Sequence, residues 1–262
     1  MRRTARPRLS GAAFVGLNNG GPPGSLVRER ALRVLGPALT ALCSVAAVHT
    51  DDPVLAITFD DGPDPVWTPV LLDVLDRHRL TATFFMLAAK AEPEATLARE
   101  VLDRGHEVGL HGIDHTRLPA LSPAEARRVM LEGKQRLEAV LQRPVVLFRP
   151  AYGAQRLNEV FAARRLGMRT IIWNAWAEDW RPQAPAEVAE RAASACRPGS
   201  ILLLHDSYEP DGPDDSSPAP GFDRAEALEM LLQRLHGDGL GVTDVGRLLA
   251  GREPVLVPWL AR

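Results

Sequence analysis

The sequence has few of the residues that build disulfide frameworks or sulfur-ligated metal sites. Only two cysteines, Cys43 and Cys196, occur among 262 residues, and no Cys-x-x-Cys pair is present. Two cysteines cannot form the multi-disulfide scaffold of a small secreted domain, and without a Cys-x-x-Cys pair the chain lacks the usual arrangement for holding a metal through sulfur. Any metal bound by this chain must therefore use imidazole or oxygen ligands.

Neither an excess of positive charge nor an uninterrupted apolar segment is available for binding nucleic acid or crossing a membrane. The 31 Lys and Arg residues are balanced by 33 Asp and Glu residues, giving a net charge of −2. The apolar stretch at residues 34–48 is interrupted by Gly36 and Pro37 and is too short to span a bilayer. We therefore expect no nucleic-acid partner and no integral membrane span, and the sequence leaves the oligomeric state open.

What the sequence does have is a repeated strand-and-helix rhythm. From Val54 onward, short apolar runs alternate with longer amphipathic ones, a pattern typical of a parallel sheet covered by helices. The pattern predicts strands at residues 54–59, 82–86, 107–109, 145–148, 170–173, 201–204 and 240–243. Helices are expected at about 67–78, 93–104, 123–141, 155–166, 185–195 and 223–236. The predicted fold is α/β, a single-domain distorted (β/α) barrel with about seven parallel strands.

The expected domain boundaries lie where this alternation of strands and helices begins and ends. The barrel domain should occupy residues 54–250, with a C-terminal tail at 251–262. Residues 1–53 would form a basic tail followed by an apolar segment. A long stretch rich in Pro, Asp, Ser and Gly at residues 208–222 is expected to be a mobile rim loop or disordered.

Two interpretations of the N-terminal apolar segment remain open. It could be a signal peptide with an apolar region at Ala38–Val45 and a cleavage site near Ser44–Ala46. It could instead be a helix over about residues 26–47 whose apolar face packs on the domain. The compositional features of the two overlap.

Polar residues follow several of the predicted strands. In an α/β barrel, functional groups lie at the carboxyl ends of strands, so these residues are the candidates for a site. They are Asp60, Asp61, His111, His115, Arg149, Tyr152, Asp179 and His205. We expect the barrel to bring them together on one face.

Two of these groups suggest metal chemistry when taken together. His111 and His115 are spaced to lie on one side of a helical turn, and Asp60-Asp61 adds carboxylates, although each group alone has an ordinary structural explanation. One carboxylate and two imidazoles form a three-ligand site that leaves positions for water and substrate. Asp60 could then accept a proton from water, and His205 could protonate a leaving group. The expected cofactor is a divalent metal, zinc first, with cobalt or nickel as alternatives.

The candidate residues also lie in motifs that resemble those of the polysaccharide deacetylases, carbohydrate esterase family 4, over about residues 54–250. The matching segments are Thr58–Pro63, Ala82–Phe85, Gly105–Gly109, Phe148–Gly153, Asp179–Trp180 and Leu203–His205. The resemblance implies that Asp61, His111 and His115 bind the metal. It also implies that Asp60 is the general base and that Arg149 pairs with it and orients it.

The same resemblance implies roles for the remaining site residues. The backbone amide of Tyr152 would help to stabilise the oxyanion. His205 would be the general acid, with Asp179 tuning it. Trp180 would form a wall of the acetyl pocket, and Leu203 would face the acetyl methyl group.

The chain departs from the family pattern at three positions near these motifs. Gly112 stands where Ser or Thr is usual, Ala151 where Pro is usual, and Trp176 where the fourth motif usually has an Asp. No departure removes an implied ligand or catalyst, but together they argue against transferring a particular substrate. Asp206, which follows His205, is expected to stabilise the next turn.

The resemblance implies a metal-dependent hydrolase that removes acetyl groups from the N-acetylated amino sugars of a peptidoglycan-like or chitin-like glycan. Two alternatives keep the site but change the substrate: an O-acetyl esterase acting on an acetylated glycan, and a deformylase acting on a lipid-linked sugar. An alternative of another class is a catalytically inactive glycan-binding barrel. Because such polymers lie outside the cytoplasm, the expected location is the cell envelope or the exterior, with the cytoplasm left open.

Overall fold

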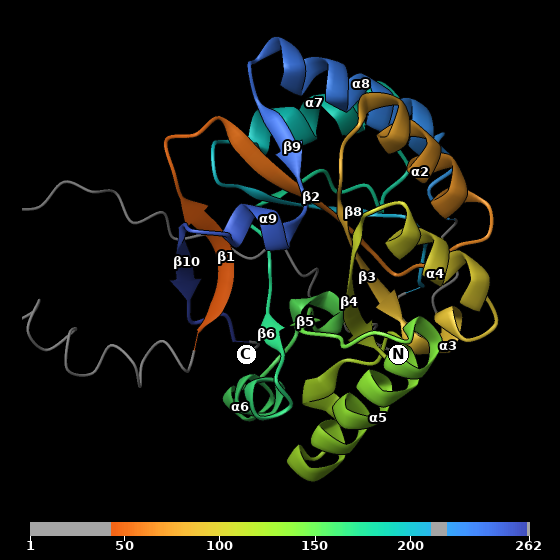
Figure 1. The fold of residues 1–262 in the computed structure, drawn as a ribbon, viewed down its shortest axis with the longest axis vertical. Coiled ribbons are helices and arrows are strands. Elements are labelled where there is room, and N and C mark those ends of the chain that lie inside the picture. Colours follow the sequence, from red (N-terminus) through yellow and green to blue (C-terminus); the bar gives the residue numbers. More distant parts are fainter. Residues whose placement is uncertain (1–42, 211–218, 261–262) are drawn as a thin grey trace, which may run out of the picture. The chain divides into compact units, whose positions relative to one another are not determined.

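The fold is an α/β arrangement built on a curled parallel sheet (Figure 1). The computed structural model describes residues 43–210 and 219–260. The main sheet has the order β6-β5-β4-β3-β2-β8-β7, and β9 also pairs with β2. The strands are β2 Val54–Asp60, β3 Thr83–Leu87, β4 Glu107–Gly112, β5 Leu147–Phe148, β6 Arg169–Thr170, β7 Ala175–Trp176, β8 Ile201–His205 and β9 Gly241–Thr243. The predicted distorted (β/α) barrel is confirmed.

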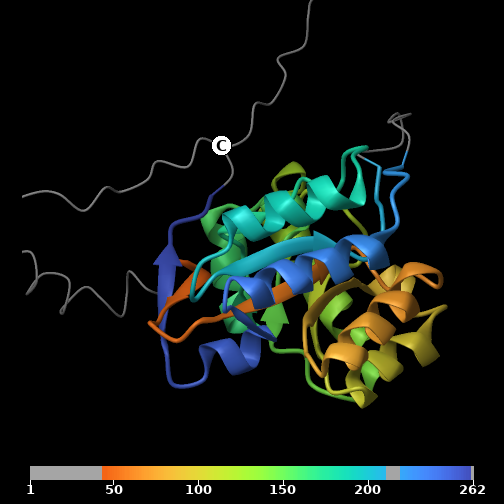
Figure 2. The ribbon, with the colours of Figure 1, turned by 90° about the horizontal axis from the view of Figure 1, so that it is seen from above.

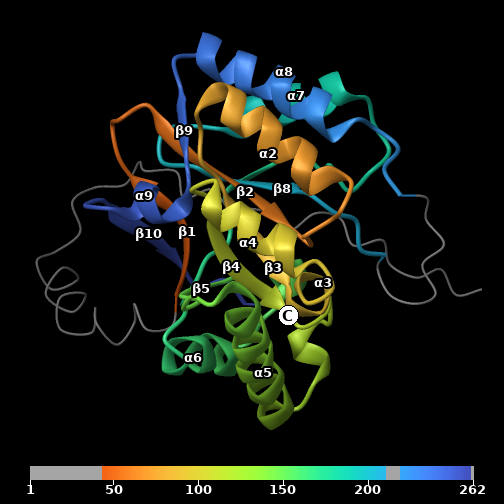
Figure 3. The same cartoon turned by 45° about the vertical axis from the view of Figure 1, so that its right-hand side comes forward.

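Helices cover the outside of this sheet. Helices α2, α8 and α7 lie side by side on one flank, and α3, α4 and α5 lie on the other (Figures 1 and 3). Figure 2 shows α7 and α8 running alongside each other. The helices are α2 Trp67–His78, α3 Ala88–Ala91, α4 Ala95–Asp103, α5 Pro123–Leu141, α6 Leu157–Arg165, α7 Pro185–Ala195, α8 Arg224–Gly237 and α9 Val245–Leu249, with 3₁₀ turns η1 Leu118–Ala120 and η2 Ala151–Gly153.

The central strand shows why the buried runs of the sequence form a sheet. In β2, Leu55, Ile57 and Phe59 are almost fully buried in the main hydrophobic core, as expected for a strand covered on both faces. β2 pairs in parallel with both β3 and β8, and the register places Asp60 beside His205. The carboxyl ends of these strands therefore carry polar residues of two distant motifs to the same edge.

Helix starts follow local chemistry. Ser122 accepts a hydrogen bond from the backbone N–H of Glu125, and Pro123 occupies the first position of α5. At α8, the Asp223 side chain accepts from the backbone N–H groups of Ala225 and Glu226. These caps satisfy N–H groups that have no partner within the helix.

The structure corrects the prediction for the N-terminal apolar segment. Residues Ser44–His49 form a strand, β1, antiparallel to β10 at Glu253–Val257, so the helix expected over 26–47 is wrong for its last residues. A cleavage site near Ser44–Ala46 would fall inside this strand, whose first five residues are buried. Apolar periodicity cannot distinguish a short buried strand from a buried helix, and the partner strand lies at the other end of the sequence. Residues 26–42, including most of the suggested signal core, lie outside the described residues.

Smaller differences concern the later strands and the rim. The strand expected at 170–173 is shorter, at Arg169–Thr170, and the sequence did not predict β7 or β10. β10 lies within the expected C-terminal tail. Part of the expected rim loop at 208–222 lies outside the described residues. In the portion of the chain that the structure describes, no helix is both long and apolar enough to cross a membrane.

Candidate active site

Asp61, His111 and His115 converge at the carboxyl ends of β2 and β4. The Nε2 atoms of His111 and His115 each lie 3.2 Å from Asp61 Oδ1. The three potential ligand atoms all lie within 4.8 Å of one another. Asp61 and His111 are buried, and the His115 side chain is 13% exposed. The predicted metal-ligating residues are therefore brought together.

The polar atoms in this cluster fit a divalent cation. Asp61 Oδ1 is buried and has no hydrogen-bond partner within residues 43–210 and 219–260, although the Nε2 atoms of His111 and His115 both face it. His111 Nδ1 lies 2.9 Å from the carbonyl oxygen of Arg149, which favours the tautomer that leaves Nε2 free to face Asp61. One carboxylate and two imidazoles are a common ligand set for zinc and similar ions.

Burial and neighbouring groups shift the pKa of each of these three ligands. Burial lowers the pKa of His115 to about 4, although Asp61 opposes this, so the imidazole is neutral and able to bind a metal near neutral pH. Burial also disfavours charge on His111, but Asp60 and Asp61 outweigh it and raise the pKa of His111. Burial alone would raise the pKa of Asp61, yet the nearby imidazoles hold it below its usual range.

The turn after β2 places Asp61 in this position. Asp61 has a left-handed backbone with φ 77, and Gly62 follows it. A Cβ atom on Gly62 would lie 2.1 Å from Asp206 Oδ2, so this close approach requires glycine. Asp206 accepts a 2.5 Å hydrogen bond from the Thr68 hydroxyl of α2, and burial raises the pKa of Asp206 to about 7. Asp206 thus has a structural role, but it packs behind the Asp60-Asp61 turn, not in the turn after His205 where that role was expected.

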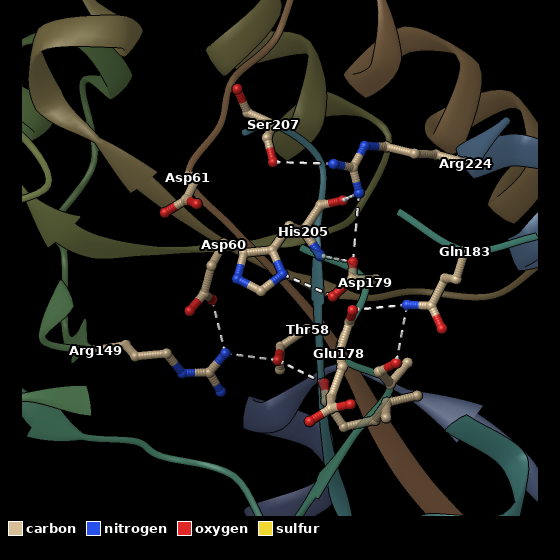
Figure 4. A network of polar contacts seen from close by, with 12 residues as sticks. Thr58, Asp60, Asp61, Arg149, Glu178, Asp179, Gln183, His205, Ser207 and Arg224 are labelled. Carbon is tan, nitrogen blue, oxygen red and sulfur yellow. Dashed lines mark hydrogen bonds and ion pairs between the residues drawn. The ribbon is translucent and has the colours of Figure 1, made fainter. Parts of the chain in front are cut away.

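Asp60 is held by a fully buried arginine (Figure 4). Arg149 Nη1 donates to Asp60 Oδ1 at 2.7 Å and to the Thr58 hydroxyl at 2.7 Å. Its Nε and Nη2 groups donate to the carbonyl oxygens of Ile171 and Ile172 at 3.3 Å and 3.2 Å. These contacts fix the guanidinium plane, so the Asp60 carboxylate has a defined orientation. The predicted pairing of Arg149 with Asp60 is present.

His205, which is 14% exposed, pairs with the buried Asp179 (Figure 4). His205 Nδ1 lies 2.8 Å from Asp179 Oδ1, and the His205 backbone N–H donates to Asp179 Oδ2 at 2.8 Å. Burial opposes a charge on the imidazole, but Asp179 more than offsets it and raises the pKa of His205 to about 9. A histidine with this pKa is protonated at neutral pH and can donate a proton from Nε2.

The remaining predicted site residues line the same region. Trp180 is 38% exposed, and its ring meets the His205 ring edge-on at 5.6 Å between centroids. Leu203 is buried two residues before His205 in β8, so both side chains leave the same face of the strand. Its register partner is Trp176 of β7.

Tyr152 lies in η2 with a left-handed backbone, φ 58. Its ring centroid is 4.1 Å from that of His115, and the Arg117 guanidinium lies 3.5 Å from the centre of the Tyr152 ring. The tyrosine ring thus packs at a tilt against a candidate metal ligand.

Gly112, one of the departures from the family pattern, has φ 138, and a Cβ there would lie 2.7 Å from the Asp114 carbonyl oxygen. This turn between the two histidines therefore requires glycine.

Sequence reasoning missed two contributors to the site. Arg224, the first residue of α8, is buried and contacts both Asp179 and the His205 carbonyl. Trp259, beyond β10, donates from Nε1 to the Gly153 carbonyl at 3.0 Å and so supports the turn that carries Tyr152. No local signal marks either residue, because each is far in sequence from the motif that it contacts. Together, the barrel and its polar edge define an α/β protein with a buried site suited to metal-assisted hydrolysis.

Comparison with known proteins agrees with this class. A family model for polysaccharide deacetylases matches residues 47–171. A chitooligosaccharide deacetylase of Sinorhizobium fredii is 33% identical over 202 residues, covering 77% of this chain and 94% of its own. A peptidoglycan-N-acetylglucosamine deacetylase of Bacillus cereus is 32% identical over 208 residues, covering 77% and 91%. The chain belongs to the polysaccharide deacetylase family, carbohydrate esterase family 4, and the expected hydrolase class is confirmed.

Solved structures of this family are also similar. A pseudoenzyme from Bacillus anthracis aligns with a TM-score of 0.68 at 25% identity, covering 78% of this chain and 68% of that one. An acetyl xylan esterase from Clostridium thermocellum, solved with a cobalt ion, aligns with a TM-score of 0.65 at 26% identity, covering 75% and 90%. Because one barrel hosts an esterase and a pseudoenzyme, the substrate of this chain must be argued from its own residues.

Proposed function

We propose that this protein is a metal-dependent deacetylase that hydrolyses the acetamide of N-acetylated amino sugars in a peptidoglycan-like or chitin-like glycan. The proposal rests on two ion pairs, Asp60–Arg149 and Asp179–His205, that lie beside the cluster of Asp61, His111 and His115: Asp60 Oδ2 is 3.8 Å from His111 Nε2, and His205 is the register partner of Asp60. Because Asp60 and His205 are register partners at the ends of adjacent strands, a base and an acid face one reaction centre.

The metal would be held by Asp61, His111 and His115, with zinc the first candidate and cobalt or nickel as alternatives. When bound, it would supply Lewis-acid polarisation of the acetyl carbonyl and activation of water. This is the contribution that the side chains cannot make themselves.

The chain's own residues would carry the proton transfers. Asp60, oriented by Arg149, accepts a proton from the water that attacks the acetyl carbon. His205, held by Asp179, donates its Nε2 proton to the amide nitrogen as the carbon–nitrogen bond breaks. The products are acetate and a free amino sugar. An amide nitrogen is a poor leaving group, so a histidine that is protonated at neutral pH suits this substrate.

Binding of the acetyl group and of the developing charge would fall to the surrounding residues. The Tyr152 backbone amide donates to the oxyanion. Trp180 and Leu203 enclose the acetyl methyl group, since the Trp180 ring meets the His205 ring edge-on and Leu203 leaves β8 on the same face as His205. Because the proposed polymers are extracellular, the protein would act in the cell envelope or outside the cell.

A second candidate function is O-acetyl ester hydrolysis, which the similarity to an acetyl xylan esterase favours. An inactive barrel, as in the related pseudoenzyme, is opposed by the intact base, acid and ligand set. Acetate release from N-acetylglucosamine oligomers, peptidoglycan and acetylated xylan separates the three possibilities. Zinc-loaded wild type should act on the amino-sugar substrates, and D61A should not.

D60N is the matched variant for this experiment, because it changes the base but none of the proposed ligands. It should retain zinc, measured by metal analysis after dialysis, while losing turnover. Loss of zinc from D60N would assign Asp60 to the metal instead. Acetate release from acetylated xylan alone would favour the esterase. If the zinc-loaded protein releases acetate from none of the three substrates, the proposal is contradicted.

A further inference from the structure

Arg224 lies outside the family motifs and is a buried cation that reaches toward His205 and Asp179 (Figure 4). It opens α8, is 6% exposed, and lies with its guanidinium carbon 5.1 Å from the centre of the Phe222 ring. A charge removed from water is unfavourable unless it is paired and hydrogen-bonded. The partners that compensate this charge therefore indicate what the residue does.

Those partners all belong to the segments that carry the proposed acid. Arg224 Nη1 donates to the His205 carbonyl oxygen at 2.8 Å and lies 3.4 Å from Asp179 Oδ2. Arg224 Nη2 donates to the Ser207 carbonyl oxygen at 3.4 Å. One rigid guanidinium thus links the end of β8 to the loop that supplies Asp179.

The geometry of Asp179 shows the consequence. Its Oδ2 accepts from the His205 backbone N–H and from Arg224, while Oδ1 faces His205 Nδ1. Both carboxylate oxygens are therefore committed, and the carboxylate cannot rotate without losing a contact. The imidazole orientation depends on Asp179, and the orientation of Asp179 depends in part on Arg224.

We propose that Arg224 is a positioning residue for the acid step: it fixes Asp179 and the end of β8 so that His205 Nε2 faces the departing nitrogen. This inference rests on the proposed deacetylase function. It predicts a selective defect, because only a poor leaving group needs the proton from His205.

The test compares R224Q and R224K with R234Q, which removes an exposed arginine from the same helix. Each protein is assayed on an N-acetylglucosamine oligomer, whose amine must be protonated, and on 4-nitrophenyl acetate, whose phenolate leaves without an acid. R224Q should lower kcat on the amide by about tenfold or more while changing KM little. Its rate on the aryl ester should change less than about twofold. R224K should recover part of the loss, and R234Q should match the wild type.

A spectroscopic readout separates failure of this inference from failure of the proposed function. In proton NMR, the His205 Nδ1 proton that bridges to Asp179 should give a downfield resonance, assigned by its loss in D179N. R224Q should shift or broaden it, whereas R234Q should leave it unchanged. This measurement requires no turnover, so it remains decisive if the wild type hydrolyses neither substrate.

An unchanged resonance in R224Q overturns the inference, as does an equal loss of rate on the two substrates. Circular dichroism melting identifies a variant that fails to fold. If R224Q does not fold, the same criteria are applied to R224K. This variant retains a buried cation but lacks the planar guanidinium group that joins the two segments.

Discussion

Arg149 Nη1 lies 2.7 Å from Asp60 Oδ1, and the two side chains are 0% and 3% exposed. The carboxylate that would act as base is thus held by a charge that water cannot replace. A base fixed in this way has little orientational freedom left to lose when substrate binds. Each of the two buried charges, however, depends on the other for its stability.

Replacing Arg149 with Met keeps a similar volume and leaves Asp60 buried without its cation. We expect R149M to lower the free energy of unfolding by about 3–5 kcal/mol, because breaking a buried pair strands a charge. R128M, which removes an exposed pair between Arg128 and Glu132, should change it by about 0–1 kcal/mol. Urea denaturation followed by circular dichroism measures both, and similar losses in the two variants would contradict the expectation.

The pair between His205 and Asp179 predicts a pH dependence of stability. The pKa of His205 in the folded state is about 9, above its ordinary value of 6.5. The folded state therefore binds this proton more tightly than the unfolded state does. The resulting stabilisation is fully present below about pH 6.5, shrinks as the pH rises, and is lost above about pH 9.

The measurement is the difference in unfolding free energy between wild type and H205Q at several pH values. This difference should decline as the pH rises from about 6.5 to about 9. D179N should show a flatter profile, because it lacks the carboxylate that raises the pKa of His205. A difference that grows with pH would show that the imidazole is neutral in the folded protein.

Metal binding should stabilise the folded protein through the clustered ligands. Zinc at about 100 times its dissociation constant would add about 2.7 kcal/mol, because it binds the folded state preferentially. Differential scanning fluorimetry should show a rise in Tm for the wild type and little or none for H115Q. H78Q is the matched control, since His78 is a partly exposed histidine that pairs with Glu229 and does not belong to the cluster. An equal rise in H115Q and wild type would remove His115 from the ligand set.

The support of the Tyr152 turn by Trp259 can be tested with a conservative change. W259F keeps an aromatic ring beside Trp173 but loses the Nε1 donor to the Gly153 carbonyl. We expect a loss of about 1 kcal/mol in unfolding free energy, the usual effect of removing one hydrogen bond. If this turn positions the oxyanion donor, kcat should also fall.

L260A changes the neighbouring exposed residue and should alter neither quantity. W259F with wild-type stability and kcat would show that the Trp259 hydrogen bond does not support the site.

Much of the barrel and its edge could be predicted from the sequence because the deciding interactions are local. Alternating buried runs and amphipathic helices, with caps such as Ser122, specify each element within a short segment. The parallel arrangement of the strands brings together the polar residues that lie at or just after the buried runs, namely Asp60, Asp61, His111 and His115. The resemblance to the family motifs then predicted their roles.

Only the tertiary structure decided the rest, because it depends on contacts between distant segments. Residues 44–49 are a strand since their hydrogen-bonding partner is Glu253–Val257, and no local pattern specifies that pairing. Arg224 and Trp259 serve the site through contacts with His205 and Gly153, which neighbour them only after folding. The sequence by itself determined which groups are available for chemistry at the strand ends. The folded chain decided which buried charges and hydrogen bonds hold those groups in place, since burial and partner geometry exist only after long-range packing.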